Sequence, residues 1–569
     1  MDIEGSKGVE AMANDKRKAL PIGIANFYKL RNYNFCYVDK TRLIQRLLDT
    51  QTDAILFTRP RRFGKSLALS MLRRFFDCNE KDKNRSLFEG LAVAQSERYM
   101  SEQGKYPVIF FDFKAVEGET QEELKESLRN ALHDALLPYE YLVQSNKLLP
   151  REKERMDRLL RSQTSISDIS TSLSFVCSLL FKHHGQPTVI LIDEYDAPLQ
   201  SAYKFGFYQP ICTVMRKLFS SALKGNDSLR LGVVTGVLRI AKDSLFSGLN
   251  NLEVDTIMSE DYADCFGFTQ AEVDQLANHY GANAKRKEIQ EWYDGYRFGE
   301  LDIYNPWSVL QYLRNKCTPQ PYWLQTSSND LTIEFLHRLE NNKREQVWEL
   351  YRGGTVKAAV DTSVSYQQLG STDTDILFSL MAVTGYLKPI KALAGGRYLL
   401  QVPNAEVNSV FATEIASYLK REHSVTDLQD LLDALLDQDH DAFVAQLRNI
   451  LMQTVSYLDG QEAFYHGFMT CLLLGLNEKY EVLSNREAGQ GRADILLQPR
   501  FDKSLPGFVF EFKRGDETAN LDNLAEAALR QIAEKQYAAA FPPEIREVRC
   551  YGLAFCKKDC DLKWECIAR

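Results

Sequence analysis

Four short runs of apolar, largely β-branched residues, separated by stretches with helical periodicity, occupy the first half of this 569-residue chain. The runs are Ala54–Thr58, Pro107–Phe113, Thr188–Asp193 and Leu229–Thr235. Near-continuous apolar runs of this length are typical of parallel strands that are buried on both faces. Helical stretches such as Gln121–Leu137 lie between them. The alternation therefore predicts a doubly wound α/β domain around a parallel sheet.

The composition is that of an ordinary globular protein, with 44% hydrophobic and 26% charged residues, which excludes a mainly disordered, collagenous or coiled-coil chain. The net charge of −8 argues against a general nucleic-acid coat and still allows a local basic groove. The first twenty residues lack the apolar segment of a secretory signal, and the longest apolar run, Gly467–Leu476, is too short to span a bilayer. Eleven cysteines, mostly scattered, fit a reduced environment. We expect a soluble, cytoplasmic protein with no membrane partner.

The first run leads directly into Arg59-Pro-Arg-Arg-Phe-Gly-Lys-Ser66 and then into a helix, which is the setting of a phosphate-binding loop. Gly64 would let backbone N–H groups close on phosphate oxygens, Lys65 would reach the β- and γ-phosphates, and Ser66 would coordinate Mg²⁺. The early glycine of the usual loop is replaced by Arg59, so the turn must differ. Taken alone, the motif is also compatible with a basic turn that binds nothing. The expected nucleotide contacts are Arg61, Arg62, Phe63, Gly64, Lys65, Ser66, Leu67, Asp193 and Thr235.

The third run ends in Asp193 followed by Glu194, as a nucleotide-hydrolysing site requires. Asp193 would hold the Mg²⁺ shell, and Glu194 would orient or deprotonate the attacking water. Thr235, at the end of the fourth run, either senses the γ-phosphate or only caps its strand. Three arginines, Arg61, Arg239 and Arg297, remain alternatives as γ-phosphate partners.

Six motifs in this order resemble the bacterial AAA-ATPase-like family: YVDKT (37–41), RPRRFGKSL (59–67), LIDEYDAP (191–198), LFSGLNNL (245–252), WYDGYRFG (292–299) and YNPWSVL (304–310). The resemblance implies ATP as the nucleotide and accounts for Arg59, since the family's loop also lacks the early glycine. That family often carries a C-terminal nuclease-like domain. Tyr296 and Arg297 fall within a family motif. Either they have a functional role, or they only pack the domain.

A second group of polar residues stands near the C-terminus. Asp494 begins one predicted strand, and Glu511 and Lys513 alternate with phenylalanines in the next, so that both polar side chains share one face. A hairpin would bring Asp494 beside that face. Two carboxylates suit Mg²⁺ or Mn²⁺, which would activate water, and Lys513 would stabilise the developing charge on a phosphate. The alternative is an edge hairpin with ordinary surface charges.

This D…E-x-K pattern resembles the PD-(D/E)XK nuclease superfamily, and the resemblance covers about 455–569. From about residue 460, the secondary-structure elements of this chain are expected in the order helix, strand, strand, helix, strand, strand. By this resemblance Glu462 could supply an outer metal ligand and Gln531 a polar group that faces the site. His466 lies four residues from Glu462, on the same helix face. For these three residues a purely structural role remains open.

Four cysteines cluster at the end of the chain, at 550, 556, 560 and 566. Some nucleases of the superfamily hold an iron–sulfur cluster, but these spacings contain no C-x-x-C pair. We expect structural cysteines on a final hairpin. Between the two domains, 355–375 is expected to be an irregular connection, Ala394–Gly396 the turn of a hairpin, and 424–455 an amphipathic helix.

The expected organisation is a flexible tail (1–20), an AAA-like P-loop ATPase domain (21–300), a helical or winged connecting region (301–455) and a nuclease-like domain (456–569). The favoured function is ATP binding and hydrolysis coupled to metal-dependent cleavage of nucleic acid, DNA rather than RNA, through backbone contacts. A homo-oligomer is compatible with this interpretation. The alternatives are a nucleotide-operated switch whose nuclease-like domain only binds nucleic acid or protein, and a scaffold with two vestigial sites.

Overall fold

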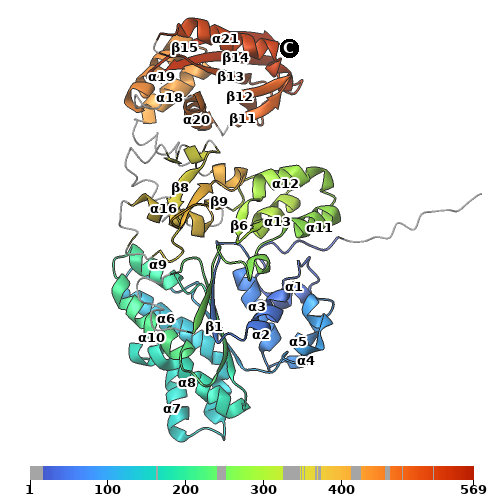
Figure 1. The fold of residues 1–569 in the computed structure, drawn as a ribbon, viewed down its shortest axis with the longest axis vertical. Helices are drawn as coiled ribbons and strands as arrows, with labels where there is room; N and C mark the ends of the chain where they lie inside the picture. The colour runs from blue at the N-terminus through green and yellow to red at the C-terminus, as the bar shows by residue number, and fades with distance from the viewer. Residues whose placement is uncertain are drawn as a thin grey trace, which may run out of the picture. The chain divides into compact units, whose positions relative to one another are not determined.

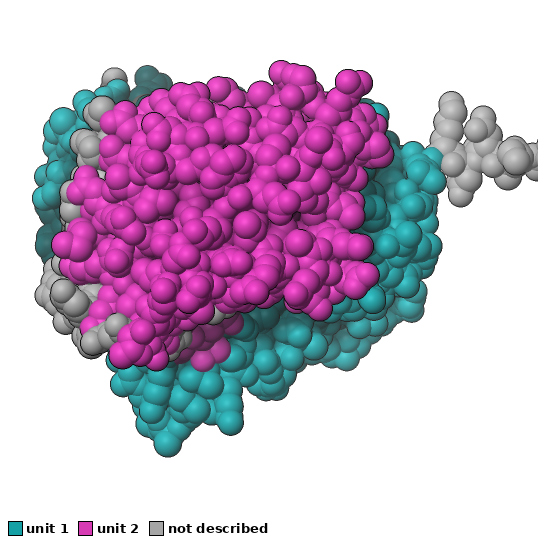
Figure 2. Space-filling view, turned by 90° about the horizontal axis from the view of Figure 1, so that it is seen from above, with its two compact units in different colours: residues 1–328, 357–406 teal, residues 329–356, 407–569 magenta. Residues whose placement is uncertain are grey.

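The computed structural model describes residues 17–161, 164–239, 251–323, 346–347, 349–351, 353–364, 368, 373–409, 411, 425–454, 462–476, 479–516 and 518–569. The chain divides into two compact units (Figure 2). Unit 1 comprises 1–328 and 357–406, and unit 2 comprises 329–356 and 407–569. In the part of the chain that is described, no helix is long and apolar enough to cross a membrane.

Unit 1 is built around a five-stranded sheet in the order β2-β3-β4-β1-β5. All its pairings are parallel, as the apolar runs predict. The strands are β1 (Ala54–Thr58), β2 (Val108–Asp112), β3 (Thr188–Asp193), β4 (Leu229–Gly236) and β5 (Leu252–Asp255). β1 and β3 are buried along their whole length, which explains why neither shows polar alternation.

Helices cover this sheet, with α1–α5 and α6–α10 drawn on opposite sides of it in Figure 1. They are α1 (Phe27–Asn32), α2 (Arg42–Thr50), α3 (Lys65–Phe76), α4 (Lys81–Ser86), α5 (Glu97–Met100), α6 (Gln121–Leu136), α7 (Pro150–Leu160), α8 (Ile166–His184), α9 (Ala197–Lys204) and α10 (Tyr208–Leu223). α6 starts at a capping box, in which Thr120 and Glu123 satisfy each other's backbone N–H groups, and it buries leucines at 124, 128, 132 and 136.

A smaller subdomain of unit 1 follows β5. Its helices α11 (Gln270–Tyr280), α12 (Arg286–Tyr293) and α13 (Pro306–Arg314) enclose an aromatic-rich core of their own. β6 (Tyr296–Phe298) and β7 (Leu301–Ile303) form a hairpin beside them. α13 begins at Asn305, whose side chain accepts from the backbone N–H groups of Trp307 and Ser308, so the start of this helix is firmly placed.

The middle region carries a three-stranded sheet in the order β8-β10-β9, together with α16 (Thr374–Thr384). The strands are β8 (Val356–Ala359), β9 (Lys388–Ala392) and β10 (Arg397–Gln401). The hairpin expected at 394–396 is confirmed, with Gly395 and Gly396 both at positive φ. The expectation of a wholly irregular 355–375 was wrong, because VKAA alternates buried and exposed residues as a half-buried strand does.

Unit 2 packs helices on both faces of a sheet in the order β11-β12-β13-β14-β15. The strands are β11 (Tyr480–Ala488), β12 (Gly491–Pro499), β13 (Gly507–Arg514), β14 (Glu547–Cys556) and β15 (Asp559–Ala568). α18 (Val425–Leu436), α19 (His440–Thr454) and α20 (Glu462–Leu473) share a core with one face, and α21 (Leu521–Glu534) packs on β14 and on the other face.

Two details of unit 2 correct the expected element order. Three strands, not two, precede α21, because the edge strand β11 is polar and was missed from sequence. The single helix expected over 424–455 is divided into α18 and α19. The interruption includes Gln438, whose φ of +62° cannot continue a right-handed helix.

Candidate functional site

The loop between β1 and α3 ends in a turn that contains two residues at positive φ. Gly64 takes the N-cap position of α3 at φ +89°, a left-handed conformation that a side chain would oppose. Arg62 also has a positive φ of +69°, which is uncommon for a residue other than glycine. These two residues turn the chain so that α3 begins with Lys65, and its free N–H groups face the loop.

Lys65 is buried at the start of α3 and folds back over the loop. Its ammonium donates hydrogen bonds to the carbonyl oxygens of Arg59 (2.9 Å) and Pro60 (3.0 Å). Burial lowers the pKa of Lys65, while Glu194, Asp196 and Asp193 oppose the shift. The arrangement holds a cation over the loop, where phosphate oxygens can take the place of the two carbonyl groups.

Arg59, which stands at the position of the early glycine, is held in the core beside the loop. Its guanidinium is fully buried, forms an ion pair with the Asp255 carboxylate on β5, and donates to the carbonyl oxygen of Thr58 (2.9 Å). It also lies over the rings of Phe266 and Phe298, at 5.2 and 4.9 Å from their centroids. Arg59 therefore anchors the loop to the neighbouring strand and points into the core rather than toward phosphate.

The acidic strand end lies at the same sheet edge. β4 separates β1 from β3, so the residues that follow β4 lie between the loop and Asp193. Thr235 on β4 donates its hydroxyl to Asp193 Oδ1 at 2.5 Å, and the Glu194 N–H donates to the same oxygen at 3.1 Å. The structure thus joins Thr235 to Asp193, which fits either a sensing role or a structural one.

Glu194 is positioned by a strained backbone. Its φ is +50°, a conformation that non-glycine residues hold mainly where the surrounding structure enforces it. Burial raises the pKa of its carboxyl, Lys65 opposes that shift, and Asp193 and Asp196 add to it. A carboxylate with a raised pKa is suited to accept a proton from water.

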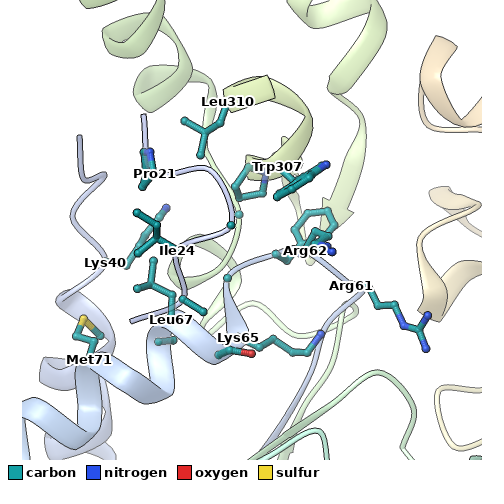
Figure 3. A pocket seen from close by; sticks show the side chains of 18 of the residues that line it. Pro21, Ile24, Lys40, Arg61, Arg62, Lys65, Leu67, Met71, Trp307 and Leu310 are labelled. Atoms are coloured by element: carbon teal, nitrogen blue, oxygen red, sulfur yellow. The ribbon is translucent and has the colours of Figure 1, made fainter. Parts of the chain in front are cut away.

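These groups border a cavity of about 450 Å³, within the range of small-molecule sites. Lys65, Ser66 and Glu194 line its polar part. Figure 3 shows apolar side chains gathered beside the loop, while Arg61 points away from them. The apolar part of the lining includes Pro21, Ile24, Leu67, Met71, Leu276, Trp307 and Leu310. A polar end with a lysine and an apolar end side by side suit a nucleotide, whose base is a flat aromatic ring that can stack on apolar side chains.

The candidate arginines are used differently. Arg62 lines the cavity and stacks on Trp307 at 4.5 Å from the ring centroid. Arg61 donates to Gln200 Oε1 at 3.4 Å. Arg297 forms an ion pair with Glu300, and among the described residues that line the cavity neither Arg297 nor Arg239 occurs. Phe63 is buried against Tyr296, with ring centroids 4.9 Å apart, so the domain-packing interpretation of Tyr296 fits the structure.

The second site lies on the central strands of unit 2. Phe508, Phe510 and Phe512 of β13 enter the core shared with α18–α20, while Val509 enters the core on the α21 face. Glu511 and Lys513 follow the alternation of Val509, as predicted, and their charged groups lie 3.6 Å apart. β12 pairs antiparallel with β13, and the Phe512 N–H donates to Asp494 Oδ2 at 2.7 Å.

Glu511 is the most perturbed group of this site. It is only 4% exposed, and Gln531 on α21 donates to its Oε1. Burial, reinforced by Asp494 and opposed by Lys513, raises the pKa of Glu511 to about 7. Gln531 is therefore a site-facing group, as the resemblance implied.

The helix α20 contributes to the same site through His466. Its Nε2–H donates to the backbone carbonyl oxygen of Asp494 at 2.8 Å, which fixes the position of β12 at that residue. Glu462 begins α20, but its side chain lies outside the described part of the structure.

The chemistry of the donor set fits a hard divalent cation. Glu511 Oε2 is buried without a hydrogen-bond partner among the described residues, and Asp494 supplies a second carboxylate beside it. Across the described residues no group of three or more His, Cys, Asp and Glu side chains is placed so that it could hold a metal ion, so Asp494 and Glu511 would have to hold it as a pair. A metal bound there would polarise water and a phosphate oxygen.

Comparison with known proteins identifies the two domains that carry these residues. Residues 21–246 match the model of a family described as "Predicted AAA-ATPase", and residues 460–565 match that of the PD-(D/E)XK nuclease superfamily. This chain joins an AAA-ATPase-like domain to a PD-(D/E)XK nuclease-superfamily domain. An "Uncharacterized protein in vnfD 5'region" from Azotobacter chroococcum mcd 1 is 28% identical over 558 residues, 95% of this chain and 96% of the relative. The similarity therefore extends through both domains.

Sequence reasoning missed Asp196 and the apolar lining of the ATPase-like domain. The Asp196 carboxylate accepts from the N–H groups of Val237 (2.9 Å) and Leu238 (3.0 Å), which holds the loop after β4 at the site. Its position as the third acid of LIDEYDAP was the available signal. Trp307 lies in the quoted YNPWSVL motif, whereas nothing in the local sequence marks Pro21 or Ile24. The quoted motif at 245–252 falls largely outside the described residues.

In the nuclease-superfamily domain, the four C-terminal cysteines lie on the β14–β15 hairpin, as expected. Cys550 and Cys560 are buried and Cys566 is exposed. The strand register places Cys560 opposite Phe555 and Cys566 opposite Arg549. Cys550 packs in the core on the α21 face and Cys560 in the core on the opposite face, which gives them a structural role.

Proposed function

We propose that the ATPase-like domain binds and hydrolyses ATP with Mg²⁺ at the β1–α3 loop. The observation that carries this proposal is the convergence of Lys65, Ser66 and Glu194 on one cavity that also has an apolar end. Lys65 would leave the carbonyl groups of Arg59 and Pro60 for the β- and γ-phosphates, Asp193 would hold the metal's water shell, and Glu194 would accept the proton of the attacking water.

Titration calorimetry of the full chain with Mg²⁺ and ATP tests this binding. Lys65→Ala is expected to lower the affinity for ATP by at least about tenfold, since it removes a charge-assisted contact worth about 1.5–3 kcal/mol. Lys29→Ala, which removes an exposed lysine on α1, serves as the matched control. Unchanged affinity in Lys65→Ala would contradict the assignment.

We further propose that the nuclease-superfamily domain cleaves phosphodiester bonds of nucleic acid, DNA in preference to RNA, with Mg²⁺ or Mn²⁺ held by Asp494 and Glu511. The buried, unpartnered Oε2 of Glu511 beside Asp494 and Lys513 supports this step. Lys513 would stabilise charge on the phosphate, while Gln531 and His466 hold Glu511 and the Asp494 strand in place. ATP at the other domain would control cleavage.

Incubation of the full chain with single- and double-stranded DNA and RNA, with Mg²⁺ or Mn²⁺, identifies the substrate. Asp494→Ala is expected to abolish cleavage, and Asp502→Ala, an exposed aspartate of the same domain, is expected to retain it. If neither the wild type nor the control cleaves any substrate while ATP is turned over, the nucleotide-operated switch replaces the nuclease.

A further inference from the structure

The chain passes between the two units three times, after residues 328, 356 and 406. Trp323 lies five residues before the first of these points, and Glu406 is the last residue of unit 1 before the third. The two residues are directly bonded, because the backbone N–H of Trp323 donates to Glu406 Oε1 at 2.8 Å. The chain leaves unit 1 at the first and the third of these points, and the segments before both exits are therefore tied to each other inside that unit.

Trp323 also bonds to the nucleotide loop. Its indole N–H donates to the carbonyl oxygen of Arg61 at 3.2 Å. The loop is thus two hydrogen bonds away from Glu406. The indole is almost completely buried, so this bond is not readily replaced by water.

Glu406 makes a second connection to the same cavity. It is fully buried, and the Ser308 hydroxyl lies 3.0 and 2.8 Å from its two carboxylate oxygens. Ser308 stands in the first turn of α13, next to Trp307, whose ring lines the cavity and faces Arg62. Glu406 therefore holds two segments that each touch the loop.

Ring packing reinforces the connection. Phe63 of the loop contacts Tyr296 at 4.9 Å, and Trp323 contacts Tyr386 at 5.2 Å between ring centroids. Gly385, at φ +93°, has no room for a side chain without crowding the Pro60 ring, since a Cβ there would lie 3.1 Å from it. Because these groups are close-packed, a change in the loop cannot be absorbed without moving Trp323.

We infer that Trp323 and Glu406 transmit the nucleotide state of the loop to the chain segments that lead into unit 2. The inference rests on the proposed binding of ATP at this loop. Phosphate would draw Lys65 away from the carbonyl oxygens of Arg59 and Pro60, which directly precede Arg61. A ligand that favours one loop conformation then biases the position of Trp323 and, through it, of Glu406.

Hydrogen–deuterium exchange of the full chain, with and without ATP and Mg²⁺, tests this inference. In the wild type, ATP is expected to alter exchange both in the loop (59–67) and in α18 and α19 of unit 2. Trp323→Phe, which keeps the ring and removes the indole donor, is expected to lose the response in unit 2 and to keep that of the loop. Its ATP dissociation constant should rise by no more than about fivefold, as expected for one neutral hydrogen bond.

Two variants of Glu406 separate the hydrogen bonds from simple packing. Glu406→Ala is expected to lose the response in unit 2. Glu406→Gln is expected to keep it, because the amide oxygen can accept from Trp323 and the amide N–H can donate to Ser308. Trp292→Phe, the same exchange in a tryptophan that packs on the α11–α13 core, is the matched control.

The outcomes distinguish the inference from the proposed function. No protection of 59–67 by ATP in the wild type would refute ATP binding at the loop. Protection of the loop with no response in unit 2, or with an equal response in the wild type and Trp323→Phe, would overturn the inference alone.

Discussion

Replacing Arg59 tests whether this residue anchors the nucleotide loop or binds phosphate. Arg59→Met leaves the Asp255 carboxylate, only 3% exposed, without its cation. Removing one partner of a buried ion pair typically costs about 3–5 kcal/mol, because the remaining charge is uncompensated. We therefore expect Arg59→Met to lower the free energy of unfolding by about that amount, with some loss of packing against Phe266 and Phe298 included.

The double variant Arg59→Met/Asp255→Leu removes the stranded charge as well. Exchange of a whole buried pair for apolar residues of similar volume is often neutral or stabilising, so the double variant should be more stable than Arg59→Met by about 2 kcal/mol or more. Urea unfolding of the wild type, Arg59→Met, Asp255→Leu and the double variant, followed by circular dichroism, gives the coupling free energy between the two residues.

The stability of Arg59→Met relative to the wild type should also depend on pH. Burial raises the pKa of Asp255, with Arg59 opposing the shift, so loss of Arg59 raises it further. A folded-state pKa above the unfolded one means that stability falls as pH rises between the two values. The deficit of Arg59→Met should therefore be smaller at pH 5 than at pH 8. Additive effects of the two substitutions, or ATP binding that is lost in the double variant, would refute the anchoring account.

Three further predictions follow from individual contacts. Burial raises the pKa of the Glu406 carboxyl from 4.5 to about 7, a difference that corresponds to about 3 kcal/mol. The stability of the wild type therefore falls as pH rises through this range, so the free energy of unfolding of Glu406→Gln, measured in urea, should increase relative to that of the wild type between pH 5 and pH 8. A pH-independent difference between the two proteins would contradict this. Gly552→Ala should destabilise the nuclease-superfamily domain by about 1–3 kcal/mol, because a Cβ would lie 2.3 Å from Ala525 O and 2.4 Å from Leu529 N of α21; a melting temperature equal to that of the wild type would show that α21 can shift. Glu511→Gln should abolish saturable Mn²⁺ binding, measured by electron paramagnetic resonance. The control Glu534→Gln, which changes an exposed glutamate of α21, should leave Mn²⁺ binding unchanged. Equal Mn²⁺ affinity in the two variants would exclude Glu511 as a ligand.

The parallel sheet could be predicted closely because its strands are buried on both faces. β1 and β3 begin and end at the residues that the apolar runs indicated, and the alternation in GFVFEFK correctly placed Glu511 and Lys513 on one face. β11 could not be predicted in the same way, because an edge strand has few buried residues and YEVLSNREA shows a weak pattern. The break between α18 and α19 likewise has no glycine or proline to mark it.

Some residues of the candidate sites could be predicted from local sequence and others could not. A local motif in a recognisable strand or helix context marks Lys65, Asp193, Asp494 and Glu511. The role of Arg59 became clear only with Asp255, which lies almost two hundred residues away in sequence. The bond between Trp323 and Glu406 is also set by tertiary packing, so neither residue carries a local signal.

The measurement that tests the central claim most directly is the rate of nucleic-acid cleavage by the wild type, Lys65→Ala and Asp494→Ala, each with and without ATP. The account predicts cleavage by the wild type that changes with ATP, cleavage by Lys65→Ala that no longer responds to ATP, and none by Asp494→Ala. Cleavage by Asp494→Ala at the wild-type rate, or an ATP response that survives in Lys65→Ala, would contradict it.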